Sequence, residues 1–284
     1  MPTISPGGDP TQAGVDVPAQ LIERPITIPG AHGAVAATVA EVGRGTPFVF
    51  LHGLVGLNEH WDDVARRFSS HARCVLLQIP LLQLEGDDCC IQGVTDLTVR
   101  FLRQHFARPD GSVEPVCLVG NSFGGHVALR LAIEQPSLVR GLVLAGSSGL
   151  IEKSIVSDVQ IRPSRDWLRR KIGELFYDER NMREADLDRA FKELSSRSGA
   201  RAMVKLSRSA RRNHLGAKLG QIGCPTMLIW GKQDIVTPPE AAEGFLAAIK
   251  GSRITWFDRC GHAPMIECPG AFADAMLDFE RSLK

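Results

Sequence analysis

The sequence predicts an α/β fold built on a doubly wound, mostly parallel sheet, and three observations support this prediction. Short apolar runs alternate with segments whose apolar residues recur every three or four positions. Continuous apolar runs of this kind are typical of strands buried on both faces of a parallel sheet. The chain has 284 residues, of which 44% are hydrophobic and 23% are charged, and this suits one large domain.

The strands are expected in chain order, and the first two should form a hairpin. Ile26–Ile28 and Val35–Val42 are β-branched runs separated by Gly and Pro. Further strands are predicted at Pro47–Leu51, Cys74–Ile79, Pro115–Val119, Leu142–Leu144, Thr226–Trp230 and Ile254–Phe257. Helical patterns lie between them at Glu59–Ser70, Ile91–Phe106, Gly125–Glu134, Glu240–Ile249 and Ala271–Ser282. This alternation of strands and helices indicates a doubly wound sheet.

Two segments depart from this alternation. Residues 1–20 are rich in Pro, Gly and small polar residues, and they are predicted to be a disordered leader. Residues 151–215 show helical patterns without a convincing buried strand and carry 16 Lys and Arg against 10 Asp and Glu. They are predicted to form a helical cap over one edge of a core made of residues 21–150 and 216–284. Solvated helices are the alternative, and a role of their charge in steering substrate stays open.

Composition and charge argue against several classes of protein. The chain has 33 Lys and Arg against 32 Asp and Glu, so it has no overall field for nucleic acid or an anionic membrane. The mean hydropathy is −0.03, and no apolar run approaches the ~20 residues that span a bilayer. The number of cysteines, seven, is odd, which argues against a disulfide framework. Their spacing does not match that of metal ligands, so no metal site is expected. Without a secretory signal, a reduced cytoplasmic protein is expected.

The clearest chemical signal is Gly-Asn-Ser-Phe-Gly-Gly at residues 120–125. It follows a predicted strand and opens a predicted helix, which is the context that a nucleophile elbow requires. The turn is so tight that Gly is needed two residues before and two residues after Ser122. The Ser122 hydroxyl then stands at a helix N-terminus, where the helix dipole favours developing negative charge. Ser122 is therefore the predicted nucleophile.

A serine hydroxyl needs a base, and the base needs an acid to orient it. His262 follows the last predicted strand within Cys-Gly-His-Ala-Pro-Met and is the predicted base. Asp234 follows the strand Thr226–Trp230 within Gly-Lys-Gln-Asp and is the predicted acid. Both therefore come at the carboxyl ends of strands. Asp258 competes with Asp234, but it stands only four residues before His262.

The loop after the strand Pro47–Leu51 reads His-Gly-Leu-Val-Gly and is the expected oxyanion loop. A tetrahedral intermediate needs two backbone N–H donors. We predict that they are the amides of Leu54 and of Phe123, which directly follows the nucleophile. His52 is interpreted as a residue that shapes this loop and not as a second base.

In order, spacing and context, these motifs resemble the α/β-hydrolase superfamily from about residue 25 to the end of the chain. The resemblance implies an eight-stranded, mostly parallel sheet with a helical cap inserted after the sixth strand. It also implies an acyl-enzyme mechanism in which Ser122 attacks an acyl carbon, His262 moves the proton and Asp234 orients His262. No cofactor motif accompanies these residues.

Within this superfamily the sequence is compatible with more than one type of reaction. Ser rather than Asp as nucleophile argues against haloalkane dehalogenase or epoxide hydrolase chemistry. The Gly-Asn-Ser-Phe-Gly-Gly segment is similar to meta-cleavage-product hydrolases, which break a C–C bond beside a ketone. Those enzymes usually carry Pro after His-Gly and Trp after the catalytic His, where this chain has Leu54 and Ala263. We predict hydrolysis of a small carboxylic ester, and C–C hydrolysis is the alternative. Lactonase, amidase and cofactor-free haloperoxidase-like activities rank below these two. A non-catalytic ligand-binding member of the fold is the rival from another class.

The substrate pocket is expected between the sheet edge and the cap. Apolar candidates for its lining are Leu54, Phe123, Leu150, Trp167, Phe176 and Met265. Arg162, Arg165 or Arg169 could bind a substrate carboxylate by bidentate pairing, although solvated helix faces explain them equally well. The expected partner is a small acyl substrate, without cofactor, metal, nucleic acid or membrane. A homodimer stays open.

Overall fold

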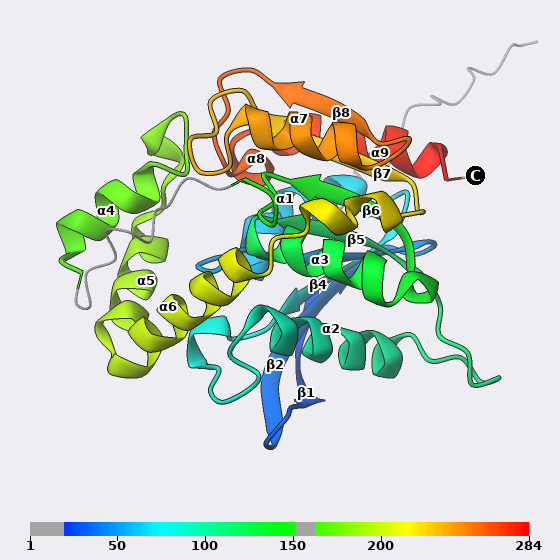
Figure 1. Cartoon of the computed structure of the whole chain (residues 1–284), viewed down its shortest axis with the longest axis horizontal. Helices are drawn as coiled ribbons and strands as arrows, with labels where there is room; N and C mark the ends of the chain where they lie inside the picture. The colour runs from blue at the N-terminus through cyan, green and yellow to red at the C-terminus, as the bar shows by residue number, and fades with distance from the viewer. Residues whose placement is uncertain (1–19, 152–162, 284) are drawn as a thin grey trace, which may run out of the picture.

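The computed structural model describes residues 20–151 and 163–283, which contain an eight-stranded sheet with helices on both faces (Figure 1). The strand order is β1-β2-β4-β3-β5-β6-β7-β8. β2 pairs antiparallel with β1 and β4, and all other neighbours are parallel. The strands are β1 (Ile22–Pro29), β2 (Ala34–Val42), β3 (Pro47–Leu51), β4 (Arg73–Gln78), β5 (Val116–Asn121), β6 (Val139–Ala145), β7 (Thr226–Gly231) and β8 (Arg253–Phe257). The predicted fold class is confirmed, while the predicted leader falls almost entirely outside the described residues.

The central strands are apolar on both faces because helices cover both sides of the sheet. β3, β5 and β7 are buried at every position. Along β3, Val49 and Leu51 belong to one hydrophobic core, and Phe48 and Phe50 belong to the core on the opposite face. This alternation is the period of a strand, so a run that is apolar throughout serves two cores at once.

β6 begins three residues before the apolar run that predicted it. The additional residues are Val139, Arg140 and Gly141. Gly141 breaks the apolar pattern in the sequence, but the Phe279 ring of the last helix packs over it, at 3.0 Å from the position a Cβ would take. The aromatic ring therefore supplies the burial that the sequence pattern lacks at this point.

The helices of the core lie in two layers (Figure 1). α1 (Asp62–Phe68) and α9 (Pro269–Arg281) pack in one core, and α2 (Ile91–His105), α3 (Phe123–Glu134) and α7 (Pro239–Ala248) pack in the other. The predicted helix Glu59–Ser70 is instead a 3₁₀ turn, η1 (Asn58–Trp61), followed by α1, and the short α8 (Pro264–Glu267) was not predicted. Among the described helices, none is both long and apolar enough to cross a membrane.

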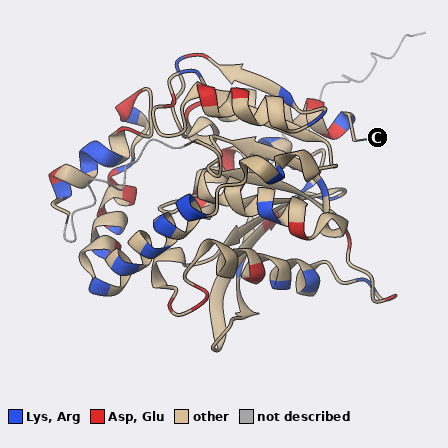
Figure 2. Ribbon diagram, in the orientation of Figure 1, with Lys and Arg blue, Asp and Glu red and all other residues tan. Residues whose placement is uncertain are grey.

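Among the described residues, three α-helices lie between β6 and β7, within the segment predicted to be a cap, and we call them the cap helices. They are α4 (Arg165–Gly173), α5 (Glu184–Ser195) and α6 (Arg197–Arg212). The side chains of Ser164 and Ser196 cap α4 and α6 by accepting backbone N–H bonds. The apolar faces of α4 and α5 form a small core with Leu82 that includes Leu168, Leu187 and Leu194. The buried residues Ala202, Leu206 and Ala210 of α6 belong instead to one of the two cores that flank the sheet. Lys and Arg residues recur along the cap helices, as the blue segments of the ribbon in Figure 2 show.

Candidate active site

Ser122 lies at the sharp turn between β5 and α3. Its φ of 53° and ψ of −119° place the backbone in a region that L-residues rarely adopt. A Cβ at Gly120 would lie 2.5 Å from the Gly124 carbonyl oxygen, and a Cβ at Gly124 would collide with the Leu51 carbonyl. Glycine is therefore required on both sides of Ser122 by close backbone approach.

The carbonyl of Ser122 is held by several donors, which stabilises the strained turn. It accepts hydrogen bonds from the amides of His126 and Ser148, both at 3.1 Å, and from the Ser148 hydroxyl at 3.3 Å. The bond from His126 is the first of α3, so the Phe123 amide precedes the intrahelical hydrogen bonds. An amide in this position is suited to bind developing negative charge.

Asp234 and His262, far apart in the sequence, form a buried hydrogen-bonded pair. His262 Nδ1 lies 2.8 Å from Asp234 Oδ2, and the two residues are 4% and 2% exposed. The Asp234 carboxylate also accepts bonds from the amides of Val236 and Thr237 at 2.8 and 2.9 Å and from the Thr237 hydroxyl at 2.8 Å. These donors hold the carboxylate in place, so His262 Nδ1 donates to it and Nε2 remains for the cavity.

The competing acid, Asp258, lies elsewhere. Its exposed carboxylate is 3.7 Å from Lys232 Nζ. The structure therefore brings His262 together with Asp234 and not with Asp258.

The backbone around His262 is held from two sides. The Asn121 side chain donates to the carbonyls of Ala145 and His262, both at 3.0 Å. The His262 amide donates to the Leu175 carbonyl, in the loop after α4, at 2.8 Å. The sequence analysis assigned no role to Asn121 or Thr237. Their positions, directly before the nucleophile and three residues after the acid, are the signals that could have found them.

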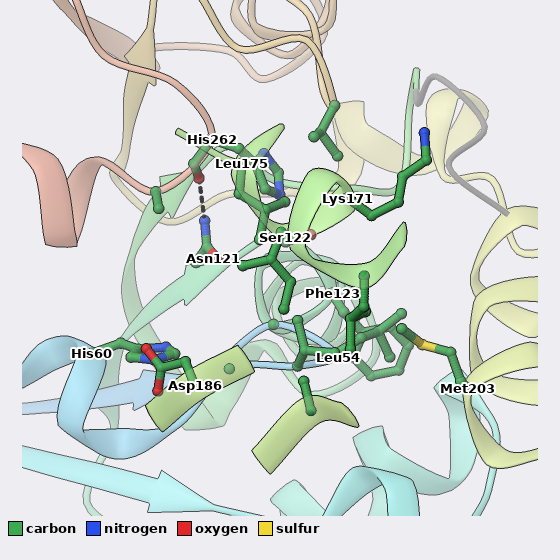
Figure 3. A pocket seen from close by; sticks show the side chains of 18 of the residues that line it. Leu54, His60, Asn121, Ser122, Phe123, Lys171, Leu175, Asp186, Met203 and His262 are labelled. Atoms are coloured by element: carbon green, nitrogen blue, oxygen red, sulfur yellow. Dashed lines mark hydrogen bonds and ion pairs between the residues drawn. The ribbon is translucent and has the colours of Figure 1, made fainter. Parts of the chain in front are cut away.

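A cavity of about 210 Å³ lies between the carboxyl edge of the sheet and the cap helices, and Ser122 and His262 both line it (Figure 3). Five of the six predicted apolar residues line it as well, namely Leu54, Phe123, Trp167, Phe176 and Met265. The prediction for Leu150 is wrong. Its side chain packs against Gly244 of α7, 2.6 Å from where a Cβ would stand, because the glycine leaves room there.

Of the predicted cap arginines, the two described ones, Arg165 and Arg169, do not line the cavity. Arg165 pairs with Glu184 and Asp188 at 2.8 and 2.7 Å, and Arg169 pairs with Glu184 at 2.5 Å. These pairs lie on the exposed surface of α4 and α5, where opposite charges satisfy both arginines. Arg162 lies outside the described residues.

Other charged groups line the cavity, and the sequence analysis did not select them. They include Lys171, Arg189 and the His60–Asp186 pair, whose nitrogen and oxygen are 3.1 Å apart (Figure 3). Burial acts to raise the pKa of Asp186, but hydrogen bonds from His60 and Arg183 outweigh it and lower that pKa to about 2. Asp186 is thus ionised at neutral pH and fully engaged by its partners.

Arg189 differs from the other cations because part of its guanidinium is buried without a partner. Nη1 donates to Glu193 at 2.9 Å and Nη2 donates to the Val55 carbonyl at 2.5 Å. Nε is buried and makes no hydrogen bond with the described residues. Arg189 lines the cavity while two of its guanidinium nitrogens are held by Glu193 and by the backbone of Val55.

His52 lies beneath the oxyanion loop and does not line this cavity. Nδ1 is 2.8 Å from the Gly53 carbonyl oxygen, and Nε2 is 3.1 Å from the Ile79 carbonyl oxygen. Burial lowers the pKa of His52 to about 4, so the ring is neutral at pH 7. Its contacts are those of a residue that shapes the loop.

Two buried neutral histidines make stability depend on pH. Burial lowers the pKa of His52 to about 4 and that of His126 to about 3, below the ordinary value of 6.5. Between pH 6.5 and 4 the unfolded chain binds protons that the folded chain excludes, so the free energy of unfolding falls as pH falls. Each histidine contributes a slope of up to about 1.4 kcal/mol per pH unit. Urea unfolding at pH 7, 6 and 5 measures this dependence of the free energy of unfolding on pH.

Replacing His126 should flatten this dependence. His126→Gln removes one titrating group, whereas His71→Gln removes an exposed one and serves as the control. The expected result is a smaller slope in the first variant and an unchanged slope in the second. Equal slopes in all three proteins would contradict the assignment of His126 as a buried neutral group.

The comparisons with known proteins agree with the fold. A family model described as "Alpha/beta hydrolase family" matches residues 48–275. The chain is 27% identical to the 2-hydroxy-6-oxo-6-(2'-aminophenyl)hexa-2,4-dienoic acid hydrolase of Metapseudomonas resinovorans, over 87% of this chain and 88% of the relative. It is 26% identical to the 2-hydroxy-6-oxononadienedioate/2-hydroxy-6-oxononatrienedioate hydrolase of Paraburkholderia xenovorans, over 87% and 91%. It is also 26% identical to the pimeloyl-(acyl-carrier protein) methyl ester esterase of Nitrosomonas europaea, over 82% and 95%.

Proposed function

Because the chain belongs to the alpha/beta hydrolase family, we propose that it is a serine hydrolase that breaks a C–C bond beside a ketone in an unsaturated keto acid. The observation that carries the proposal is the buried Asp234–His262 pair, at 2.8 Å, whose His262 lines the same cavity as Ser122. The choice of bond rests on the relatives, two of which are named as hydrolases of 2-hydroxy-6-oxo dienoic compounds. Ester hydrolysis, which the sequence analysis preferred, becomes the second candidate.

The proposed reaction begins with the Ser122 hydroxyl. Its oxygen attacks the ketone carbon while His262 Nε2 takes the proton, and Asp234 stabilises the resulting imidazolium. The amides of Leu54 and Phe123 bind the oxyanion of the tetrahedral intermediate. The C–C bond then breaks, its electron pair moves onto the leaving carbon, and His262 returns a proton to the leaving fragment. Water hydrolyses the acyl-enzyme with His262 again acting as base.

A carbon leaving group departs only when its electron pair is delocalised. A 2-hydroxy-6-oxo dienoate meets this requirement only as its keto tautomer, so a proton must move from the 2-hydroxyl to C5 before the C–C bond breaks. The electron pair left on C5 then spreads through the remaining C=C bond onto the 2-oxo group, beside the carboxylate. The protein must therefore bind an extended, anionic chain beside Ser122. The cavity walls are largely apolar, and Arg189 adds a cation on α5 with a buried, unpartnered Nε. We assign the substrate carboxylate to Arg189.

Ester hydrolysis is the second candidate, and two observations favour it. One relative of similar identity is named as a methyl ester esterase. In addition, Ala263 follows His262 where meta-cleavage-product hydrolases usually carry Trp. The same three side chains serve both reactions, since an alkoxide replaces the carbon leaving group.

A panel of substrates tests the choice between the two reactions. The wild-type protein is given a 2-hydroxy-6-oxo-6-phenyl dienoate, a short p-nitrophenyl ester and a lactone, and the loss of dienoate absorbance or release of nitrophenolate is followed. C–C hydrolysis predicts a kcat/KM for the dienoate at least about 10-fold above that for the ester. An ester rate well above the dienoate rate would reject C–C hydrolysis as the main activity.

Arg189→Met should separate anionic from neutral substrates. Loss of the cation is expected to lower kcat/KM for the dienoate by about 10- to 100-fold, because a charge-assisted hydrogen bond to the carboxylate is lost. The rate for a neutral p-nitrophenyl ester should fall much less. Arg165→Met removes a surface cation outside the cavity and is the matched control. Equal losses for both substrates would show that Arg189 does not recognise the carboxylate.

A further inference from the structure

We infer that Gln78, the last residue of β4, is a positioning residue that selects the tautomer of His52 and thereby aims the Leu54 amide at the oxyanion. The inference deepens the proposed function and rests on it for the role of Leu54. Its basis is a chain of hydrogen bonds from Asn58 through Gln78 and His52 to Gly53. None of these side chains lines the catalytic cavity among the described residues.

The orientation of the Gln78 amide is set by its first partner. The backbone N–H of Asn58 donates to Gln78 Oε1 at 2.6 Å. A backbone N–H can only donate, so the oxygen of the amide must face Asn58. The NH₂ group of Gln78 therefore faces His52 Nε2, at 3.0 Å, with the Gly56 carbonyl at 3.5 Å.

The orientation of Gln78 in turn decides which nitrogen of His52 carries the proton. Since the NH₂ group of Gln78 donates to Nε2, Nε2 must be the unprotonated nitrogen. The ring is neutral at pH 7 because burial lowers the pKa of His52 to about 4. The single proton therefore sits on Nδ1 and is donated to the Gly53 carbonyl at 2.8 Å.

Without Gln78, the two carbonyl oxygens of Gly53 and Ile79 would compete for the single ring proton of His52, and either tautomer would leave one unprotonated nitrogen facing a carbonyl oxygen. The Ile79 carbonyl oxygen lies 3.1 Å from Nε2 and would accept a proton placed there. The unprotonated Nδ1 would then face the Gly53 carbonyl at close range, and two acceptors would repel each other. Gln78 is the donor that decides between two carbonyl acceptors competing for one proton.

The Gly53 carbonyl matters because it belongs to the same peptide group as the Leu54 amide. This carbonyl accepts two bonds, from His52 Nδ1 and from the Gly56 amide at 3.0 Å. In a trans peptide the C=O and N–H point in opposite directions. Because the Gly53 oxygen is held toward His52, the Leu54 N–H points away from His52 and toward the cavity that Leu54 lines. Two donors on the oxygen also polarise the peptide and strengthen its N–H as a donor.

The first experiment reads the tautomer in the wild-type protein and needs no activity. Long-range ¹H–¹⁵N correlation spectra of histidine-labelled protein at pH 7 distinguish protonated from unprotonated ring nitrogens. His52 is assigned by the signals lost in His52→Gln. We expect Nδ1 to be protonated and Nε2 to be unprotonated. The opposite tautomer, or a doubly protonated ring, would overturn the inference, and this result stands even if variants at Gln78 fail to fold.

The second experiment measures how fast a fluorophosphonate labels Ser122, since the phosphonyl oxygen occupies the oxyanion position without any natural substrate. Gln78→Met keeps the side-chain length and removes the donor, and Gln92→Met makes the same exchange on α2, away from the cavity. In Gln78→Met we expect His52 to change tautomer and the limiting labelling rate to fall about 10-fold, less than the 10²- to 10³-fold for a donor removed outright. The fluorophosphonate concentration that gives half of the limiting labelling rate should change less than about twofold.

Three results would overturn the positioning role of Gln78. One is an unchanged tautomer in Gln78→Met. Another is a changed tautomer with an unchanged labelling rate. The third is an equal loss of rate in Gln92→Met. If wild-type Ser122 is not labelled at all, the serine hydrolase proposal fails, whereas the tautomer measured by NMR still tests the hydrogen-bond chain.

Discussion

Ser122→Ala is expected to lower kcat by about 10⁴-fold or more and to abolish labelling by a fluorophosphonate. The variant removes the only atom that forms the covalent bond in the proposed mechanism, and the amides of Leu54 and Phe123 cannot replace it. The measurement is turnover of the best substrate from the panel, together with mass spectrometry of the labelled protein.

The matched control for this variant is Ser148→Ala. Ser148 also lines the cavity, but its hydroxyl only donates to the Ser122 carbonyl at 3.3 Å. Thermal unfolding should show that both variants remain folded. Turnover retained in Ser122→Ala would refute the nucleophile assignment. A folded wild-type protein that neither labels nor turns over any substrate would favour the ligand-binding rival.

Asp234→Asn is expected to lower kcat by about 10⁴-fold through the tautomer of His262. The oxygen at this position must still accept the amides of Val236 and Thr237, at 2.8 and 2.9 Å in the wild type. The new NH₂ group then faces His262 Nδ1, which has to become the unprotonated nitrogen. Nε2 would carry the proton on the side of Ser122 and could not accept the serine proton.

Asp258→Asn is the control, because it makes the same exchange at the competing acid. Asp258 is exposed and pairs only with Lys232, at 3.7 Å, among the contacts of the described residues. Its kcat should stay within about twofold of the wild type, as for most surface substitutions. A large loss in Asp258→Asn with little loss in Asp234→Asn would reverse the assignment of the acid.

The sequence predicted the sheet well where burial and local pattern coincide. β3, β5 and β7 are buried at every position, and each contains an apolar run of at least four residues. β6 was predicted too short because Gly141 breaks its pattern, and a ring from α9 supplies the burial there. Long-range packing of this kind leaves no mark on the local sequence.

The candidate site shows the same division between local and distant information. Ser122 could be selected because its constraints are local, namely a strand before it, a helix after it and glycines two residues away. Leu150 was placed in the pocket wrongly because its direction depends on Gly244, which is distant in the sequence. Arg189 was overlooked among many cap arginines because only the folded chain distinguishes an arginine that lines the cavity from the surface pairs of Arg165 and Arg169.

The sequence by itself determined the fold class and the tight turn at Ser122, because both depend on local patterns of burial and backbone geometry, and it supplied the chain order of the three candidate catalytic residues. Only the tertiary structure decided which acid contacts His262, which of the cap cations line the cavity and which ring nitrogen of His52 carries the proton. Those outcomes depend on distances between groups that are remote in the chain. In a buried site a difference of a few ångströms decides whether a polar group is paired or left without a partner.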